Sequence, residues 1–335
     1  MKILVTGSSG HLGEALMRSF VNTRYDAVGA DLLPSAFTRF TGNLADPAFV
    51  SRCMHGVDAV IHTATLHKPH VGTHSRQDFV DTNITGTLNL LEEAVKNNVW
   101  SFVFTSTTSA FGDALTPQKG SPAAWISEEV IARPKNIYGV TKTAAEDLCR
   151  LFHRNQKLPC IILRTSRFFP EDDDNKQVRA AYTGENAKAN ELLYRRVDTA
   201  DVVSAHILAM EKATQIGFGR YIISGTSPFS PDDLDDLHAD APSVVRRYFP
   251  EYEILYSEKG WRMFPHIDRV YVNDKAREEL GWQPHYDFAH VLKCLKTGAD
   301  FVSPLARTIG AKGYHAEMFS EGPYPMEGRE QKKGG

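Results

Sequence analysis

Several features that mark other classes of protein are missing from this sequence of 335 residues. Its four cysteines (53, 149, 160 and 294) lie far apart and match no metal-ligand spacing, so we expect reduced, mostly buried thiols, as in a cytoplasmic protein. No apolar run reaches the ~18 residues that a membrane span needs. A strand expected from Lys2 leaves no room for a signal peptide. A net charge of −3 gives no reason to expect nucleic acid as the main partner.

What the first half of the chain does have is an alternation of two kinds of segment. Short apolar runs rich in β-branched residues are separated by stretches whose apolar residues recur at helical spacing. The expected strands are 2–6, 26–30, 57–64, 101–107 and 160–166, and the expected helices are 11–21, 78–98 and 136–155. This alternation predicts an α/β fold with a doubly wound parallel sheet, which binds ligands at the carboxyl ends of its strands.

The alternation weakens after residue 166, where Pro and Gly become frequent and 198–213 and 291–302 look like isolated helices. We therefore expect a nucleotide-binding domain over 1–166. A smaller mixed α/β lobe should follow over 167–310, with segments that can return to the sheet. Residues 311–335 form a tail rich in Gly, Pro and charge, which we expect to fold over the surface or to fray at its end.

The stretch TGSSGHLG (6–13) joins the first strand to the first helix. Gly7 permits the tight turn, Gly10 lets the backbone approach a pyrophosphate, and Gly13 lets the helix pack on the strand. The helix N-terminus offers free N–H groups to the phosphates. The spacing and its context predict a dinucleotide site.

Asp31 ends the second strand, where a carboxylate can accept hydrogen bonds from the two ribose hydroxyls of adenosine. The same carboxylate would repel a 2′-phosphate, so NAD is favoured over NADP. Arg39 lies near enough in sequence to keep NADP open, and a solvated Asp at a strand end is the plainer alternative.

Tyr138 and Lys142 lie four residues apart in YGVTK (138–142), on one face of an expected helix. A nearby ammonium favours the phenolate, so we expect Lys142 to lower the pKa of Tyr138 and to fit it for proton exchange. Thr107 ends the preceding strand, where its hydroxyl can bond a substrate oxygen. The pair alone is weak evidence, but together with the glycine loop and Thr107 it indicates a catalytic site.

These motifs resemble the extended short-chain dehydrogenases/reductases of the NAD-dependent epimerase/dehydratase group. This family has a Rossmann-like doubly wound sheet and a smaller C-terminal substrate lobe. The matching stretches are TGSSGHLG (6–13), Asp31, GNL (42–44), HTAT (62–65), NITGT (83–87), STTSAFG (106–112), YGVTK (138–142) and KAREELGWQP (275–284).

The resemblance implies roles for individual residues. Tyr138 is the general acid/base, Lys142 lowers its pKa and holds the nicotinamide ribose, and Thr107 binds the reacting oxygen. Asn43 stands where the family usually has Asp beside the adenine, and Asn83 is expected to be a structural polar residue. The NAD-binding set implied is Gly7, Ser9, Gly10, His11, Leu12, Gly13, Asp31, Asn43, Leu44, Thr63, Ala64, Thr65, Asn83, Thr105, Tyr138, Lys142 and Phe168.

Members of the family pass a hydride between the nicotinamide and a substrate carbon while the Tyr moves a proton. Dehydratases carry an Asp-Glu pair where this chain has Thr108 and Ser109, so dehydration is not favoured. We expect a sugar-modifying enzyme that resembles the nucleotide-sugar 4-epimerases. An NAD(P)-dependent dehydrogenase or reductase of a non-nucleotide, anionic alcohol or carbonyl compound is the alternative. A regulatory NAD-binding protein without catalysis is the third reading, and the intact Tyr138–Lys142 pair argues against it.

The second lobe bears on the substrate. Arg167 stands where nucleotide-sugar epimerases usually have an Asn near the diphosphate, and Tyr194 stands where they have an Arg. Arg262 or Arg269 can replace a later diphosphate-binding Arg. Guanidinium groups suggest an anionic substrate, although salt bridges to 171–174 would explain them equally well. The substrate-binding residues expected are His67, Lys68, Thr107, Thr108, Arg167, Arg196 and Arg262.

Three further expectations concern the surroundings of the site. The histidines of the loop 65–75 lack a matching carboxylate or Cys pattern, so we expect a substrate loop without a metal. Phe168 and Phe169 are expected to form apolar walls. The resemblance implies a homodimer that pairs the helices around 84–97 and 138–154.

Overall fold

The protein is represented by a computed structural model that describes residues 1–118 and 120–313. Its centre is a parallel sheet of seven strands in the order β3-β2-β1-β4-β5-β7-β8. The strands are β1 (Lys2–Thr6), β2 (Asp26–Asp31), β3 (Phe40–Thr41), β4 (Ala59–His62), β5 (Ser101–Thr107), β7 (Cys160–Thr165) and β8 (Phe218–Ile223). The predicted α/β fold with a doubly wound parallel sheet is confirmed.

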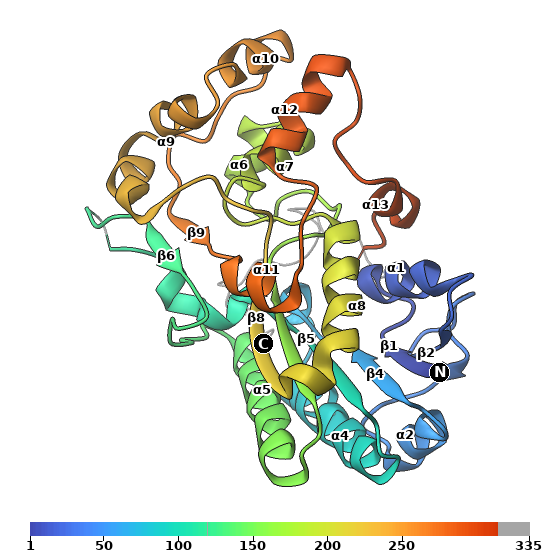
Figure 1. Cartoon of the computed structure of the whole chain (residues 1–335). Coiled ribbons are helices and arrows are strands. Elements are labelled where there is room, and N and C mark those ends of the chain that lie inside the picture. The colour runs from blue at the N-terminus through green and yellow to red at the C-terminus, as the bar shows by residue number, and fades with distance from the viewer. Residues whose placement is uncertain (119, 314–335) are drawn as a thin grey trace, which may run out of the picture.

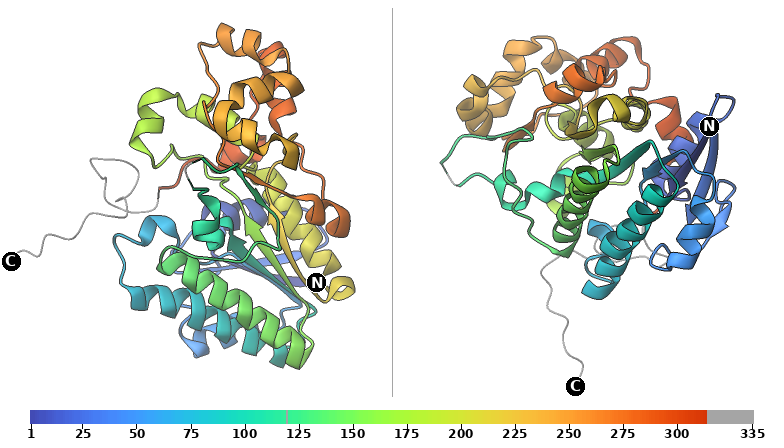
Figure 2. Two further views of the ribbon diagram at one scale, coloured as in Figure 1. Left: turned by 90° about the vertical axis from the view of Figure 1, so that its left-hand side faces the viewer. Right: turned by 60° about the horizontal axis from the view of Figure 1, so that its bottom comes forward.

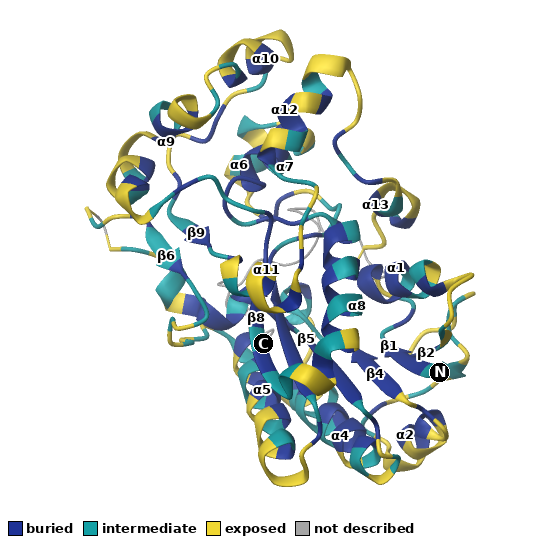
Figure 3. Ribbon diagram, in the orientation of Figure 1, coloured by how far each residue is buried: buried dark blue, intermediate teal, exposed yellow. Residues whose placement is uncertain are grey.

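Helices cover both faces of this sheet (Figure 1). The helices α1 (His11–Phe20) and α8 (Thr199–Ile216) pack on one face, with α11 (Asp274–Leu280) and α13 (Pro304–Ile309) beside them. The helices α2 (Pro47–Met54), α4 (Gly86–Lys96) and α5 (Ile137–Gln156) pack on the other face. Because both faces are covered, β4 and β7 are buried along their whole length, as Figure 3 shows for the centre of the sheet.

A second lobe lies beyond the carboxyl ends of the strands (Figure 2). It consists of α6 (Lys176–Ala181), α7 (Gly184–Glu191), α9 (Leu234–Tyr248), α10 (Tyr252–Glu258), α12 (Phe288–Thr297) and the small parallel sheet of β6 (Ala124–Ile126) and β9 (Arg269–Tyr271). Its apolar core has Tyr256, Phe264 and Phe288 among its members. The segment that follows residue 166 returns to the main sheet as α8 and β8, so the chain crosses between the two parts more than once.

Several element boundaries differ from the sequence prediction. The expected helix 78–98 is divided into α3 (Arg76–Phe79), a π-helical turn (Val80–Thr85) and α4. The expected helix 291–302 ends at Thr297, because Gly298 adopts a left-handed conformation with φ of 69°. The tail predicted over 311–335 lies outside the described residues from 314 onward.

The cysteines and the apolar character of the helices were the subject of two predictions from composition. All four cysteines are buried and free. Within residues 1–118 and 120–313, no helix combines the length and the apolar character needed to cross a membrane.

Candidate active site

Two adjoining cavities open at the carboxyl ends of the strands, one of about 690 Å³ and one of about 380 Å³. The larger cavity lies over the glycine loop and the end of β2, and the smaller one lies between β5, β7 and the second lobe. Five residues line both cavities and so mark their junction: His67, Tyr138, Thr165, Phe168 and Phe169. The junction is the place where a cofactor in one cavity and a substrate in the other would meet.

The glycine loop is shaped so that a nucleotide can approach its backbone. Gly7 has φ of +72°, and a Cβ on Gly13 would lie 1.9 Å from the carbonyl oxygen of Gly7. Gly10 is the N-cap of α1 and offers no side-chain cap, so the first N–H groups of the helix are left for another acceptor. This is the arrangement in which a helix N-terminus binds a pyrophosphate.

Asp31 lies in the lining of the larger cavity, at the end of β2. Its carboxylate accepts hydrogen bonds from the backbone N–H groups of Ser9 and Leu33, each at 2.9 Å. The carboxylate is therefore fixed in place beside the glycine loop and keeps lone pairs for ribose hydroxyls. The guanidinium of Arg39 lies 5.8 Å from the ring centre of Phe40, and Arg39 does not line the cavity.

The structure brings most of the predicted cofactor residues to the larger cavity. The residues in its lining are Gly7, Ser9, Gly10, His11, Leu12, Gly13, Asp31, Asn43, Leu44, Thr63, Ala64, Thr65, Thr105, Tyr138 and Phe168. Asn83 and Lys142 do not line it. The Asn83 side chain accepts a hydrogen bond from Leu66 N–H and donates to the Thr141 hydroxyl, both at 2.9 Å. Asn83 thus ties the loop after β4 to α5, which is the structural role the sequence suggested.

The three predicted catalytic residues lie together under the junction. Thr107 Oγ1 accepts a hydrogen bond from Ser109 N–H at 3.0 Å, and Thr107 lines the smaller cavity together with Tyr138. Burial raises the pKa of Tyr138 to about 12, and the Thr107 side chain opposes this rise. Burial also lowers the pKa of Lys142 to about 7, against the opposing charge of Glu146.

Lys142 is not one of the causes of the pKa shift of Tyr138 in this structure, so the expectation that it lowers this pKa stays a prediction. The Lys142 ammonium nitrogen lies 3.9 Å from the ring centre of Phe104, and the side chain is only 2% exposed. A group so deeply buried loses much of the hydration that stabilises its charge. At neutral pH Tyr138 is consequently a phenol that can donate a proton.

The smaller cavity receives only some of the predicted substrate residues. His67, Lys68, Thr107, Thr108 and Arg167 line it. Three further cations also line it: Lys135, Arg195 and Arg269. Arg269 was put forward as a replacement for a diphosphate-binding Arg, whereas Lys135 and Arg195 were not put forward as substrate residues. The positions of Lys135 and Arg195 depend on a loop and on the second lobe, so sequence spacing gave no sign of them.

Arg196 and Arg262 do not reach either cavity, so their predicted role in substrate binding needs correction. Arg196 is buried, and it donates to Glu191 at 2.6 Å and to the Phe169 carbonyl at 2.9 Å. Arg262 donates to the Ala181 carbonyl at 2.6 Å and packs on the ring of Tyr182. Both guanidinium groups act as links within the second lobe.

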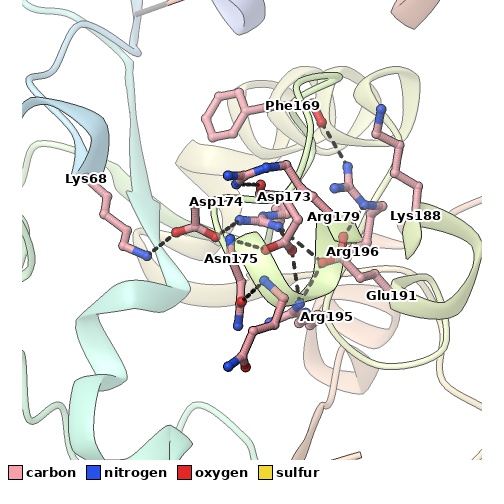
Figure 4. A network of polar contacts seen from close by, with 12 residues as sticks. Lys68, Phe169, Asp173, Asp174, Asn175, Arg179, Lys188, Glu191, Arg195 and Arg196 are labelled. Atoms are coloured by element: carbon pink, nitrogen blue, oxygen red, sulfur yellow. Dashed lines mark hydrogen bonds and ion pairs between the residues drawn. The ribbon is translucent and has the colours of Figure 1, made fainter. Parts of the chain in front are cut away.

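Arg167 forms ion pairs within the polar network that includes Asp173, Asp174 and Glu191, which Figure 4 labels. It pairs with Asp174 at 2.8 Å, with Glu191 at 3.2 Å and with Asp173. Asp174 also accepts from Lys68 at 2.6 Å, which joins the second lobe to the loop after β4. Of the two alternatives for the acidic run, pairing with neighbouring arginines is the one observed for Asp173 and Asp174.

The histidines of the loop 65–75 form ring contacts at the junction. His67 stacks on Phe169 with ring centres 5.6 Å apart, and His70 lies edge-on to His67 at 4.8 Å. Within the described part of the chain, no group of three or more His, Cys, Asp or Glu side chains is placed to hold a metal ion.

These features of the site define a short-chain dehydrogenase/reductase with an extended substrate lobe. They are the glycine loop under the larger cavity, the carboxylate at the end of β2, and the Thr107 and Tyr138 hydroxyls near the junction. A family model described as "NAD dependent epimerase/dehydratase family" matches residues 3–223. The chain belongs to this family, and its cofactor is accordingly NAD. The glycine loop, which has no room for a Cβ at Gly13, and the carboxylate of Asp31 fit that group.

Curated relatives and solved structures agree with this placement. The chain is 26% identical to a dTDP-glucose 4,6-dehydratase of Escherichia coli, covering 86% of this chain and 90% of the relative. It is 24% identical to a UDP-glucose 4-epimerase of Rhizobium meliloti, covering 86% and 94%. A UDP-glucuronic acid 4-epimerase of Bacillus cereus, solved with UDP-glucuronic acid and NAD, has the same fold, with a TM-score of 0.61 at 21% identity over 89% of this chain and 99% of that one.

Proposed function

We propose that the protein catalyses NAD-dependent oxidation and reduction at a secondary alcohol carbon of a sugar, with nucleotide-sugar 4-epimerisation as the first candidate reaction. The observation that carries this proposal is the placement of two hydroxyl side chains, since Tyr138 lines both cavities and Thr107 lines the smaller one. Both hydroxyls lie where the oxygen of a substrate in the smaller cavity would meet a cofactor in the larger one.

The side chains at the junction have distinct tasks in this proposal. NAD, when bound, supplies the redox chemistry. Tyr138 accepts a proton from the substrate hydroxyl in its phenolate form and returns it to a carbonyl oxygen as the phenol. Its raised pKa favours the phenol and therefore suits the returning step. Thr107 holds the same oxygen by a hydrogen bond. Phe168 and Phe169 keep water from the reacting carbon, since both rings line the junction.

Dehydration is disfavoured by the side chains that follow Thr107. Thr108 lines the smaller cavity next to Ser109, and neither can remove a carbon-bound proton as a carboxylate does. Three carboxylates line this cavity. Glu171 pairs with His11, and Asp174 pairs with Lys68 and Arg167, while Asp172 is exposed. The site therefore supports the redox step that epimerases and dehydrogenases share.

The ion pairing of Arg167 favours a second candidate, the dehydrogenation of a non-nucleotide sugar or sugar acid. A diphosphate needs guanidinium or ammonium groups that can turn toward it. Arg167 already pairs with three carboxylates, and Arg196 and Arg262 lie outside the cavity. Lys135 and Arg269 are the side chains on that wall that would meet a single carboxylate or phosphate, because their ion pairs are longer, at 3.3 Å to Asp113 and 3.6 Å to Asp268.

The two candidates are separated by incubating the purified protein with nucleotide sugars and with the matching free sugars and sugar acids. Interconversion of C4 epimers with no net change in absorbance at 340 nm supports epimerisation. Stoichiometric formation of NADH from a free sugar or sugar acid supports dehydrogenation. A 4-keto-6-deoxy product would contradict both. Mass spectrometry of ligands released from the purified protein identifies the cofactor and any trapped substrate.

The Tyr138→Phe variant tests the role given to the junction. Loss of a positioned acid/base lowers a rate by roughly 10²–10⁴-fold. NAD binding, followed by calorimetry, should stay within about twofold, because the ring and its contacts remain. An unchanged turnover rate in this variant would contradict the proposal.

We also propose that the protein works as a cytoplasmic homodimer. Val140 and Leu151 are exposed apolar residues on α5, the helix for which the family resemblance implies pairing. Light scattering of the purified protein, compared with a Val140→Glu/Leu151→Glu variant, tests the dimer. A monomeric parent protein would contradict it.

A further inference from the structure

Two carboxylates lie beside the helix N-terminus that is suited to a pyrophosphate. Glu14 belongs to the first turn of α1, and Glu171 follows β7 and pairs with His11 Nε2 at 2.7 Å. Their side chains are only 13% and 9% exposed. A carboxylate in such a place repels a pyrophosphate unless its charge is compensated, because screening by water is weak there.

Glu171 is held at this position from the other side. The Phe169 carbonyl accepts a hydrogen bond from Arg196 at 2.9 Å, and the Pro170 carbonyl accepts one from Lys188. Asp174 pairs with Arg167 at 2.8 Å. The chain before and after Glu171 is thus fixed to the second lobe, so the carboxylate cannot simply turn away from the phosphate loop.

Residues 310–313, which we call the strap, lie against both carboxylates. The Lys312 ammonium donates to the Ser9 carbonyl at 2.7 Å and to the Glu14 carboxylate. The backbone N–H groups of Lys312 and Gly313 donate to Glu171 at 3.1 and 3.2 Å. Although burial opposes ionisation, these contacts, with Arg18 and His11, lower the pKa of both carboxyls.

The strap is also part of the cavity itself. Lys312 and Gly313 line the larger cavity together with Ser9, Gly10 and His11. The strap follows α13, which lies beside α1 (Figure 1) and buries Ala306 and Ile309. A short helix anchored in the fold therefore delivers the strap to the glycine loop.

We propose that the strap is a component of the dinucleotide site, in which Lys312 compensates Glu14 and makes the phosphate loop receptive to the pyrophosphate of NAD. The inference rests on the assignment of NAD and not on the reaction proposed above. It predicts that replacing Lys312 weakens the binding of ligands that contain a pyrophosphate. The affinity for ligands without a pyrophosphate should not change.

Calorimetric titration of the full chain with NAD, ADP-ribose and adenosine tests this inference. Lys312→Met should weaken the binding of NAD and of ADP-ribose about tenfold, as expected for the loss of one charge-assisted contact. The affinity for adenosine should change by less than about twofold. Lys96→Met is the matched control, because Lys96 pairs with Glu93 at the far end of α4. Equal weakening of all three ligands, or NAD affinity within twofold of the parent, would overturn the inference.

The double variant Lys312→Met/Glu14→Gln tests whether Lys312 acts through Glu14. Removing the uncompensated carboxylate should recover most of the lost affinity for ADP-ribose. Persistence of the full loss would overturn the compensation role. Circular dichroism with thermal unfolding tests whether each variant remains folded. A loss of affinity in a folded variant is then not a consequence of unfolding.

Discussion

Glu146 and Arg164 form a buried, two-pronged ion pair that joins α5 to the central sheet. Arg164 Nε lies 2.9 Å from Oε1 of Glu146, and its terminal nitrogen lies 2.7 Å from Oε2. Ser106 on β5 donates to the same carboxylate at 2.6 Å. Glu146 is one turn beyond Lys142 on α5, so this pair fixes the position of the helix that carries the Tyr–Lys motif.

Replacing Glu146 should destabilise the fold more than replacing its partner. Glu146→Gln leaves the buried Arg164 and the partly buried Arg220 without a counter-charge, so we expect a loss of about 3–5 kcal/mol in the free energy of unfolding. Arg164→Met should cost less, because Arg220 at 3.1 Å remains to compensate Glu146. Urea unfolding of both variants measures the order, and a larger loss for Arg164→Met would contradict this reading.

We expect Glu191 to stabilise the fold through its ion pairs with the arginines around Arg167. Burial opposes its ionisation, but Arg196, Arg195 and Arg167 hold its pKa well below the usual range. Glu191→Gln should lower the free energy of unfolding by about 3–5 kcal/mol at pH 7. Glu185→Gln, at an exposed position of the same helix, is the control and should change little.

The contribution of Glu191 should depend on pH with a definite sign. A carboxyl whose pKa is depressed by folding stabilises the protein fully above its unfolded pKa of about 4.5 and loses that stabilisation as the pH falls. The difference in stability between the parent and Glu191→Gln should therefore be constant from pH 5 to 8 and shrink below pH 4.5. A constant difference at lower pH would show that the charge is not what matters.

Lys142 should make the protein less stable at neutral pH than at alkaline pH. Its folded pKa is about 7 and its unfolded pKa is 10.5, so between these values the unfolded chain binds a proton that the folded chain does not. Stability then rises with pH over this window. Lys142→Met should be more stable than the parent at pH 7, with the gap narrowing on the order of 1 kcal/mol per pH unit toward pH 10. Lys259→Met, at an exposed position, should show no such trend.

A methyl group at Gly13 should disrupt the glycine loop. The added Cβ would lie 1.9 Å from the Gly7 carbonyl oxygen, so α1 must move away from β1. We expect Gly13→Ala to lose more than about 3 kcal/mol of stability and to bind NAD at least tenfold more weakly. Gly298→Ala places its methyl in open space at a left-handed position and should cost only about 1–2 kcal/mol. Equal losses in thermal unfolding would contradict the packing argument.

Much of the site could be predicted because its signals are local in sequence. The alternation of strands and helices predicted the sheet, and the glycine spacing in 6–13 predicted where a cavity would lie. Tyr138 and Thr107 were found because residues at the carboxyl ends of parallel strands, and at the start of the next helix, meet at one edge of the sheet.

What the sequence could not provide were contacts between distant segments. In the sequence, nothing distinguishes three arginines from one another as anion-binding residues: Arg167, Arg196 and Arg262. In the fold, Arg167 and Arg196 pair with Glu191, and Arg262 donates to the Ala181 carbonyl outside the cavity. Whether a guanidinium is free depends on which carboxylates the folded chain brings within a few ångströms, and no periodicity encodes that.

The sequence by itself determined the class of fold and the position of the glycine loop, and it predicted which side chains are proposed to transfer protons, because short-range spacing and backbone geometry specify them. Only the tertiary structure decided the ionisation of Tyr138 and Lys142, the pairing of the arginines and the placement of Lys312 on the phosphate loop. Those properties arise from burial and from charges brought together across long stretches of chain, and burial is a property of the folded molecule.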